Sequence, residues 1–156
     1  MSKKITFFFT KEYPQSFVSY KDYMRQIIYA LRRAGIDFVF SEGYHPRPIV
    51  YSVYSLSLGV ESRIEPISAE ITTERFNEDR LRSVMPGGIT YLGYIDGYIE
   101  KYMALYRRGS VYFVLKHPEM GLGRFLKEKK IPPYEIIKED IIVEGLGSLR
   151  DYLGVK

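Results

Sequence analysis

The sequence predicts an α+β fold: a ferredoxin-like, split βαβ two-layer sandwich with an extra proline-rich loop and a C-terminal α+β extension. Two observations predict it. β-rich segments and helical segments follow one another as β-α-β, an irregular stretch with one more strand, and again β-α-β, up to about residue 95. The chain also has 156 residues, 46% of them apolar, which is enough for one ordinary domain core. We expect a ferredoxin-like domain at 1–98, and at 99–156 a β-hairpin plus α/β extension, packed on the same sheet or forming a small second lobe.

The first half of the chain holds the clearest helix pattern. Ser19 with Asp22 is a helix N-cap pattern, because the hydroxyl and the carboxylate can satisfy free N–H groups. Gly35 ends this helix. Between these points runs an apolar stripe at helical spacing, which we expect to be buried: Met24, Ile27, Ile28 and Leu31. We further expect a short helix from Asn77 to Pro86, and strands at 5–10, 36–41, 50–58, 66–72 and 89–95.

The second half predicts a hairpin followed by a helix and a last strand. The pair Gly109-Ser110 suits a type II′ turn between strands 102–108 and 110–116. A short basic helix at 123–130 ends before Pro132-Pro133. A strand at 135–143 and a helical turn at 148–153 complete the chain, and we expect Glu139 and Asp140 to lie on the surface.

The composition excludes several classes of site. The chain has no cysteine, which excludes disulfides, thiolate zinc sites, cysteine-bound iron–sulfur clusters and a cysteine nucleophile. It has two histidines, His45 and His117, so a three-histidine metal site is excluded, and no hydrolytic triad stands out. We therefore expect no metal, no cofactor and no catalytic residue. Scarce amides, absent cysteine and abundant charge fit a protein from a hot habitat.

The charge of the chain is unevenly placed. The net charge of +4 is the sum of +4 in residues 1–60, −4 in 61–100 and +4 in 101–156. A basic face of this kind attracts phosphate, although a moderately basic chain is also common without any such role. No apolar run approaches the roughly 20 residues of a membrane span, and the N-terminus lacks a secretory apolar region. We expect a cytoplasmic protein with no membrane partner.

Two segments are candidate binding surfaces. The 41–48 loop holds Ser41, Glu42, Tyr44, His45 and Arg47 beside two prolines, which stiffen it and lower the entropy lost on binding. On the first helix, Lys21, Arg25 and Arg32 lie near one stripe with Arg33 beside it, and such a stripe can follow phosphates. Each has a structural alternative, since the loop can be a simple crossover and the last-turn arginines can complement the helix dipole. A third segment, Gly121-Leu-Gly123-Arg124 with the lysines after it, also has two interpretations. It can hold a phosphate at a helix N-terminus, or it can be a turn followed by a solvated basic helix.

Four blocks of this region resemble a known family: Asp22 to Arg25, Ala30 to Gly35, Ser41 to Pro48 and Leu58 to Ser62. In this order, over about residues 5–95, they resemble the radical-SAM-linked domain family of unknown function, an uncharacterised bacterial domain that occurs free-standing or attached to radical SAM proteins. The chain departs from it at Tyr20-Lys21, where the family usually has His-Leu, and at His45 and Arg47, where it has Asn and His. The resemblance implies proximity to RNA or to radical SAM chemistry, and some members sit beside a ribonuclease of the G/E type.

Together these observations favour a non-enzymatic RNA-binding or RNA-processing accessory module related to radical-SAM-linked proteins. Arginine and lysine would meet phosphates, and Tyr44 or a neighbouring tyrosine would stack on bases. Two alternatives stay open. One is a domain, binding or enzymatic, that uses the 41–48 loop for a small anionic ligand. The other is a protein-interaction module for a radical SAM enzyme.

Overall fold

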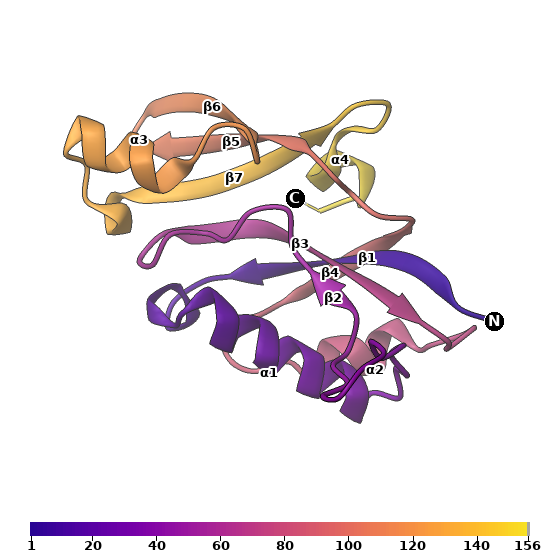
Figure 1. The fold of residues 1–156 in the computed structure, drawn as a ribbon. Coiled ribbons are helices and arrows are strands. Elements are labelled where there is room, and N and C mark those ends of the chain that lie inside the picture. The colour runs from indigo at the N-terminus through magenta and orange to yellow at the C-terminus, as the bar shows by residue number, and fades with distance from the viewer. Residues whose placement is uncertain (156) are drawn as a thin grey trace.

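A computed structural model describes residues 1–155 and has an α+β fold, in which eight strands form one mixed sheet (Figure 1). The strands are β1 (Lys3–Lys11), β2 (Val50–Tyr51), β3 (Glu61–Ile71), β4 (Tyr91–Asp96), β5 (Tyr102–Arg108), β6 (Val111–His117), β7 (Ile136–Val143) and β8 (Gly147–Ser148). The α-helices of the described residues are α1 (Tyr20–Arg33), α2 (Glu78–Ser83), α3 (Leu122–Lys129) and α4 (Leu149–Tyr152), and two 3-10 turns lie at Gln15–Phe17 and Pro133–Glu135.

The sheet has the strand order β4-β1-β3-β7-β5-β6, with β2 added to β3 and β8 to β7. Its two halves meet at β3 and β7, which are parallel and pair only at Glu61 with Ile137 and at Ser62 with Lys138. The other strand pairs are antiparallel. Helices α1 and α2 cover one side of the β1, β3 and β4 half (Figure 1). Strands β5 to β7 therefore continue the sheet away from these two helices.

Most of the expected elements are confirmed, with shifts of a few residues. Ser19 caps α1, because its Oγ accepts a hydrogen bond from the backbone N–H of Asp22 at 3.2 Å, and Asn77 caps α2 in the same way. The hairpin of β5 and β6 turns at Gly109, whose φ of +59° is the left-handed conformation that glycine adopts without strain. These elements were predictable because caps, turns and periodicity are local properties of the chain.

The expected strand at 50–58 is wrong beyond its first two residues. Only β2 pairs with the sheet, and the following loop crosses to the other half. There Tyr54 stacks on His117, with ring centroids 4.0 Å apart, and its hydroxyl accepts a hydrogen bond from the backbone N–H of Gly123 at 3.1 Å. The expected strand at 36–41 is likewise reduced to two isolated bridges, at Phe38 and Phe40.

The buried face of α1 is rotated relative to the expected stripe. Ile27 and Leu31 are buried as expected, but Ile28 and Met24 are only half-buried. Tyr20, Tyr23 and Ala30 take the remaining inward positions. Both tyrosines can be buried because each hydroxyl has a buried acceptor: Glu65 Oε1 for Tyr20 at 2.8 Å and the Thr10 carbonyl for Tyr23 at 2.9 Å.

A buried ion pair joins the two halves of the sheet. The Lys138 ammonium on β7 donates hydrogen bonds to Glu65 Oε2 on β3 at 2.8 Å and to the Tyr102 hydroxyl on β5 at 2.6 Å. Both charged side chains are fully buried. Glu65 also accepts hydrogen bonds from Tyr20 and Ser62. The carboxylate is thus fully hydrogen-bonded, which is the condition under which a buried charge is tolerated.

A second ionic cluster crosses the same junction, and it overturns the expectation that Glu139 lies on the surface. Glu139 is 9% exposed and accepts hydrogen bonds from Arg63 Nη1 on β3 at 2.9 Å and from Arg107 Nε on β5 at 2.7 Å. Burial acts to raise the pKa of Glu139, but the two arginines outweigh it and hold the pKa below its ordinary value. Asp140 is half-buried and accepts a hydrogen bond from the Ser148 hydroxyl, so it too is not a free surface carboxylate.

The rotated face of α1 gives the first prediction. Ile27→Ala should lower the free energy of unfolding by about 2–5 kcal/mol, as truncations of fully buried residues do. Ile28→Ala, one residue along on the same helix, should cost clearly less because Ile28 is only half-buried. Urea denaturation of both variants measures the difference, and equal losses would contradict the described helix orientation.

The buried ion pair of Glu65 and Lys138 gives the second prediction. Lys138→Met should destabilise the fold by about 3–5 kcal/mol, because it removes the ammonium that is hydrogen-bonded to the buried Glu65 carboxylate. The double variant Glu65→Gln with Lys138→Met should recover part of this loss, because the amide keeps hydrogen-bonding capacity for Tyr20 and Ser62 without a charge. Denaturation curves of the two variants test it, and a double variant less stable than the single one would argue against the pair.

Candidate functional site

The solvent-exposed side of α1 carries a continuous stripe of basic and aromatic residues. Lys21, Arg25, Tyr29 and Arg32 recur at intervals of three or four residues, so they lie above one another on one helix face. All four are exposed, and Tyr29 has 52% of its surface accessible. We call these four residues the helix stripe. From Lys21 to Arg32 it extends roughly 16 Å, at 1.5 Å per residue.

The charges of the helix stripe are only weakly engaged. Arg25 Nη1 lies 3.3 Å from Asp22 Oδ1, in a pair whose side chains are both more than half exposed. Exposed pairs of this kind contribute little and open easily for a competing anion. Arg33 stands beside the stripe and turns toward α2, where its Nη2 approaches the Val84 carbonyl at 3.5 Å. Lys21, Arg25 and Arg32 are therefore placed to meet a ligand in solvent, and Arg33 belongs mainly to the packing of α1 on α2.

The 41–48 loop is closed at its base. The backbone N–H of Ser41 donates to the Arg47 carbonyl at 2.8 Å, and the Arg47 N–H donates to Ser41 Oγ at 3.1 Å. The residues between them, including Glu42, are exposed, and the Tyr44 ring is almost fully accessible, in edge contact with the His45 ring at 5.5 Å. Ser41 thus has a structural role, while Tyr44, His45 and Arg47 face solvent.

One contact joins the loop to the helix stripe. The Arg32 guanidinium lies over the Phe40 ring, 5.8 Å from its centroid, directly before the base of the loop. The C-terminal end of α1 contacts α2, because Arg80 Nη2 donates a hydrogen bond to the Arg33 carbonyl at 3.1 Å. The structure therefore brings Arg32 close to the 41–48 loop, whereas Lys21 and Arg25 lie further along the helix. Sequence reasoning missed Tyr29 and Phe40, although Tyr29 follows Arg25 at i+4 and was detectable from that spacing.

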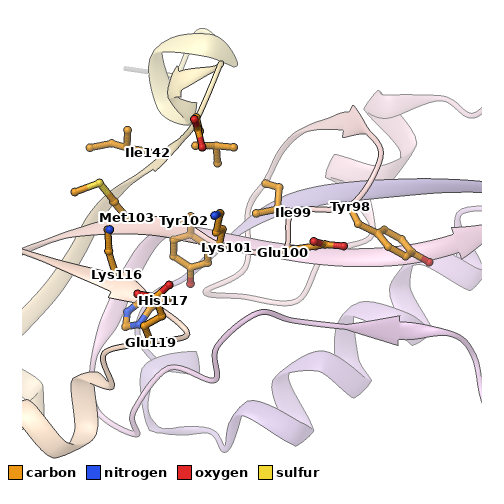
Figure 2. A pocket seen from close by; sticks show the side chains of 12 residues that line it. Tyr98, Ile99, Glu100, Lys101, Tyr102, Met103, Lys116, His117, Glu119 and Ile142 are labelled. Carbon is orange, nitrogen blue, oxygen red and sulfur yellow. The ribbon is translucent and has the colours of Figure 1, made fainter.

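A cavity of about 570 Å³ lies in the other half of the molecule, away from every residue expected to bind a ligand. It is formed by the linker before β5, the end of β6 and the end of β7. Figure 2 shows Tyr98 at one end of the lining and His117 with Glu119 at the other. Its charged lining residues are of both signs: Glu100, Lys101, Lys116, Glu119 and Glu144. No local sequence pattern indicates this cavity, because its lining comes from three separate segments.

His117 is the buried imidazole in the lining of this cavity. It is 1% exposed, its Nε2 lies 2.5 Å from the Tyr106 hydroxyl, and its Nδ1 makes no hydrogen bond. Burial, together with the nearby charge of Lys138, lowers the pKa of His117 to about 4, while the main chain of Met120 acts weakly in the opposite direction. His117 is therefore neutral near pH 7. Among residues 1–155, no group of three histidine or acidic side chains is placed to hold a metal ion.

The family comparison matches most of the chain. A family model described as an uncharacterized protein conserved in bacteria (DUF2344) covers residues 4–136, which include the helix stripe and the 41–48 loop but end before Lys138 on the β7 side of the junction. A comparison with curated proteins finds no match. Within the described residues, no helix has the length and apolar character needed to cross a membrane.

The buried His117 predicts a loss of stability in acid. Its folded-state pKa of about 4 lies below the ordinary value of 6.5, so the unfolded chain binds the proton first as the pH falls. The free energy of unfolding should drop by about 3 kcal/mol between pH 6.5 and pH 4 through this group. His117→Phe should lack this part of the pH dependence, although the buried carboxylates still contribute. Urea denaturation of both proteins across this range measures it, and parallel pH curves would contradict it.

Proposed function

The chain belongs to the bacterial family whose model covers residues 4–136, and we propose that it is a non-enzymatic module that binds RNA through the helix stripe and the 41–48 loop. The observation that carries the proposal is the exposed alternation of cations and rings along this surface. Lys21, Arg25 and Arg32 supply positive charge, and Tyr29, Phe40 and Tyr44 supply exposed aromatic surface.

These residue types match the two chemical parts of single-stranded RNA. Phosphates attract lysine and arginine, and exposed bases stack on tyrosine and phenylalanine with little sequence preference. Arg32 lies over Phe40, so a charge and a ring are already placed together at the base of the loop. The closed base of the loop limits the conformational entropy that Tyr44 and Arg47 would lose on binding.

Burial of the sheet around β1 favours α1, rather than a face of the sheet, as the RNA-binding surface. From Ile5 to Lys11, β1 is buried on both faces. A four-stranded sheet that binds RNA needs exposed aromatic residues on one face. The rings of β1 at Phe7, Phe8 and Phe9 are fully buried, so they are not available as a stacking platform.

We also infer that residues 1–98 form a ferredoxin-like domain and 99–156 an extension of its sheet. The support is the order β4-β1-β3-β2, in which each neighbouring pair is antiparallel and two helices connect the strands. For partners, we propose RNA and either a radical SAM protein or a ribonuclease of the G/E type, in the cytoplasm. We choose these partners because the blocks between Asp22 and Ser62 resemble the radical-SAM-linked domain family.

A second candidate function is the binding of a small molecule, and the 570 Å³ cavity favours it. Cavities of this size, with apolar walls and a few polar groups, are typical of ligand sites. The alternative expected from the sequence places a small anionic ligand on the exposed 41–48 loop, whose side chains do not line this cavity. A metabolite that co-purifies and is displaced when Met103→Trp fills the cavity would favour the small-molecule function.

The RNA proposal predicts the salt dependence of binding. Each phosphate contact contributes about 0.7 to the slope of log affinity against log salt for single strands. A triple Arg→Gln variant at Arg25, Arg32 and Arg47 should therefore lower the slope by up to about 2 and weaken the affinity for single-stranded RNA. Its melting temperature should stay within a few degrees, because exposed charges contribute little to stability. Fluorescence anisotropy over a salt series, beside thermal melts, measures both.

Two controls separate this surface from general basicity. The same change at Arg75, Arg82 and Arg124, all exposed and outside the proposed surface, removes the same charge and should leave most of the affinity and slope intact. Tyr29→Ala with Tyr44→Ala should weaken binding by about 1–3 kcal/mol per stacked base without changing the slope. Absence of binding by the natural protein at low salt, or equal losses in the two triple variants, would refute the proposal.

A further inference from the structure

Large hydrophobic side chains are exposed at the end of the molecule where α1 begins and its two halves meet. Tyr13 and Phe17 have 72% and 58% of their surface exposed, and their rings lie edge to face with centroids 6.2 Å apart. Leu58, in the loop before β3, and Tyr134, in the second 3-10 turn, are 58% and 69% exposed. We call these four residues the junction patch. Contiguous exposed surface of this kind is a feature of interaction sites.

Gly59 brings the segments of the junction patch together. Its backbone N–H donates a hydrogen bond to the Ser16 carbonyl at 2.7 Å, which joins the loop before β3 to the turn that carries Phe17. A side chain at Gly59 would place its Cβ 3.4 Å from Pro133 Cβ and 3.9 Å from Phe17 Cε1, so both neighbours lie within contact range. The φ of Gly59 is +94°, which glycine adopts without strain. The patch is therefore continuous from one half of the molecule to the other.

Basic residues flank the junction patch on both sides. Lys21, the first member of the helix stripe, is exposed and follows Phe17 by four residues. Lys129 and Lys130 are exposed at the C-terminal end of α3, shortly before the turn that carries Tyr134. Figure 1 shows α3 and the start of α1 at the same end of the molecule, with the loop before β3 between them. The helix stripe, the patch and the end of α3 thus alternate basic, aromatic and basic surface.

Most of the negative charge beside the patch is engaged within the protein. Glu61 Oε2 accepts a hydrogen bond from the Tyr13 backbone N–H at 3.0 Å, and Glu135 pairs with Arg108 at 3.2 Å. Glu12 is exposed next to Tyr13 and stays a local negative charge. An apolar partner protein would cover the rings but leave the flanking ammonium groups unpaired. A nucleic-acid single strand supplies a base for each ring and a phosphate for each cation.

We propose that single-stranded RNA runs as one continuous strand from the helix stripe, across the junction patch, to the end of α3. Its bases stack on the rings of the patch, and its phosphates lie against the lysines on either side. This inference rests on the proposed function and extends it, because the RNA then contacts both halves of the molecule. It also names the substrate class as an unpaired strand, since the bases of a duplex are already stacked on one another and cannot use the patch.

The length of the RNA tests this path. The affinity for oligouridylate should rise strongly between about 4 and about 12 nucleotides, which lie within the site sizes of single-strand binding folds. Phe17→Ala with Tyr134→Ala removes one ring from each half and should abolish most of this rise, with a loss of at least about fivefold per base for the longer strand. Tyr112→Ala with Tyr152→Ala is the matched control, because these rings are similarly exposed but lie on β6 and α4. Fluorescence anisotropy measures the affinities, and thermal melts verify the fold of each variant.

The lysines of α3 test the far end of the path. Lys129→Gln with Lys130→Gln should lower the slope of log affinity against log salt by up to about 1.4 for the longer strand, at about 0.7 per phosphate contact. The slope for the shorter strand should change less, because that strand does not span the whole path. The same anisotropy assay over a salt series gives both slopes.

The possible failures are distinguishable from a failure of the proposed function. If the patch variant leaves the affinity unchanged at both lengths while the variant at Arg25, Arg32 and Arg47 weakens it, RNA binds the helix stripe but does not cross the junction, and the patch fits a protein partner instead. An equal loss at both lengths would place the RNA on the patch alone and overturn the continuous path. No binding of either strand by the natural protein would refute this inference and the proposed function together.

Discussion

The buried pair of Glu65 and Lys138 holds the two halves of this molecule together, because the backbone contact between them is so small. β3 and β7 pair at only two positions, so most of the cohesion across the junction comes from side chains. The Glu65 carboxylate contacts β7 through Lys138 and α1 through Tyr20, and Lys138 continues to β5 through Tyr102. Four elements therefore depend on one ionised carboxylate that has no access to water.

The buried environment of this pair changes the pKa values of the titratable groups around it. Burial raises the pKa of Tyr20 and Tyr102 well above the ordinary value, so both phenols stay neutral and can serve as donors or acceptors for the pair. Burial with the charge of Lys138 also keeps His117 neutral. A histidine that has a lowered pKa beside a cavity is often read as a catalytic group. Here the same features follow from the junction itself, which is a sufficient structural reason for them.

The arrangement separates two kinds of surface. The helix stripe and the 41–48 loop lie on the half that α1 and α2 cover, while the cavity lies on the other half. A ligand on α1 and a ligand in the cavity would therefore not compete for the same residues. Tyr20 connects the two regions, since it belongs to the buried face of α1 and donates to Glu65. The binding helix is thus anchored directly at the junction.

The sequence by itself determined the α+β class, the capped start of α1, the hairpin at Gly109 and the basic side of the first helix, because caps, turns and periodicity act over a few residues. It placed Arg25 and Arg32 on one helix face for the same reason. Only the tertiary structure decided that Ile28 is half-exposed, that Glu139 is buried and that Tyr54 crosses to His117. These outcomes depend on partners distant in the chain: burying a charge or a phenol is favourable only when a specific counter-charge or acceptor arrives from another strand, and local sequence does not specify that arrival.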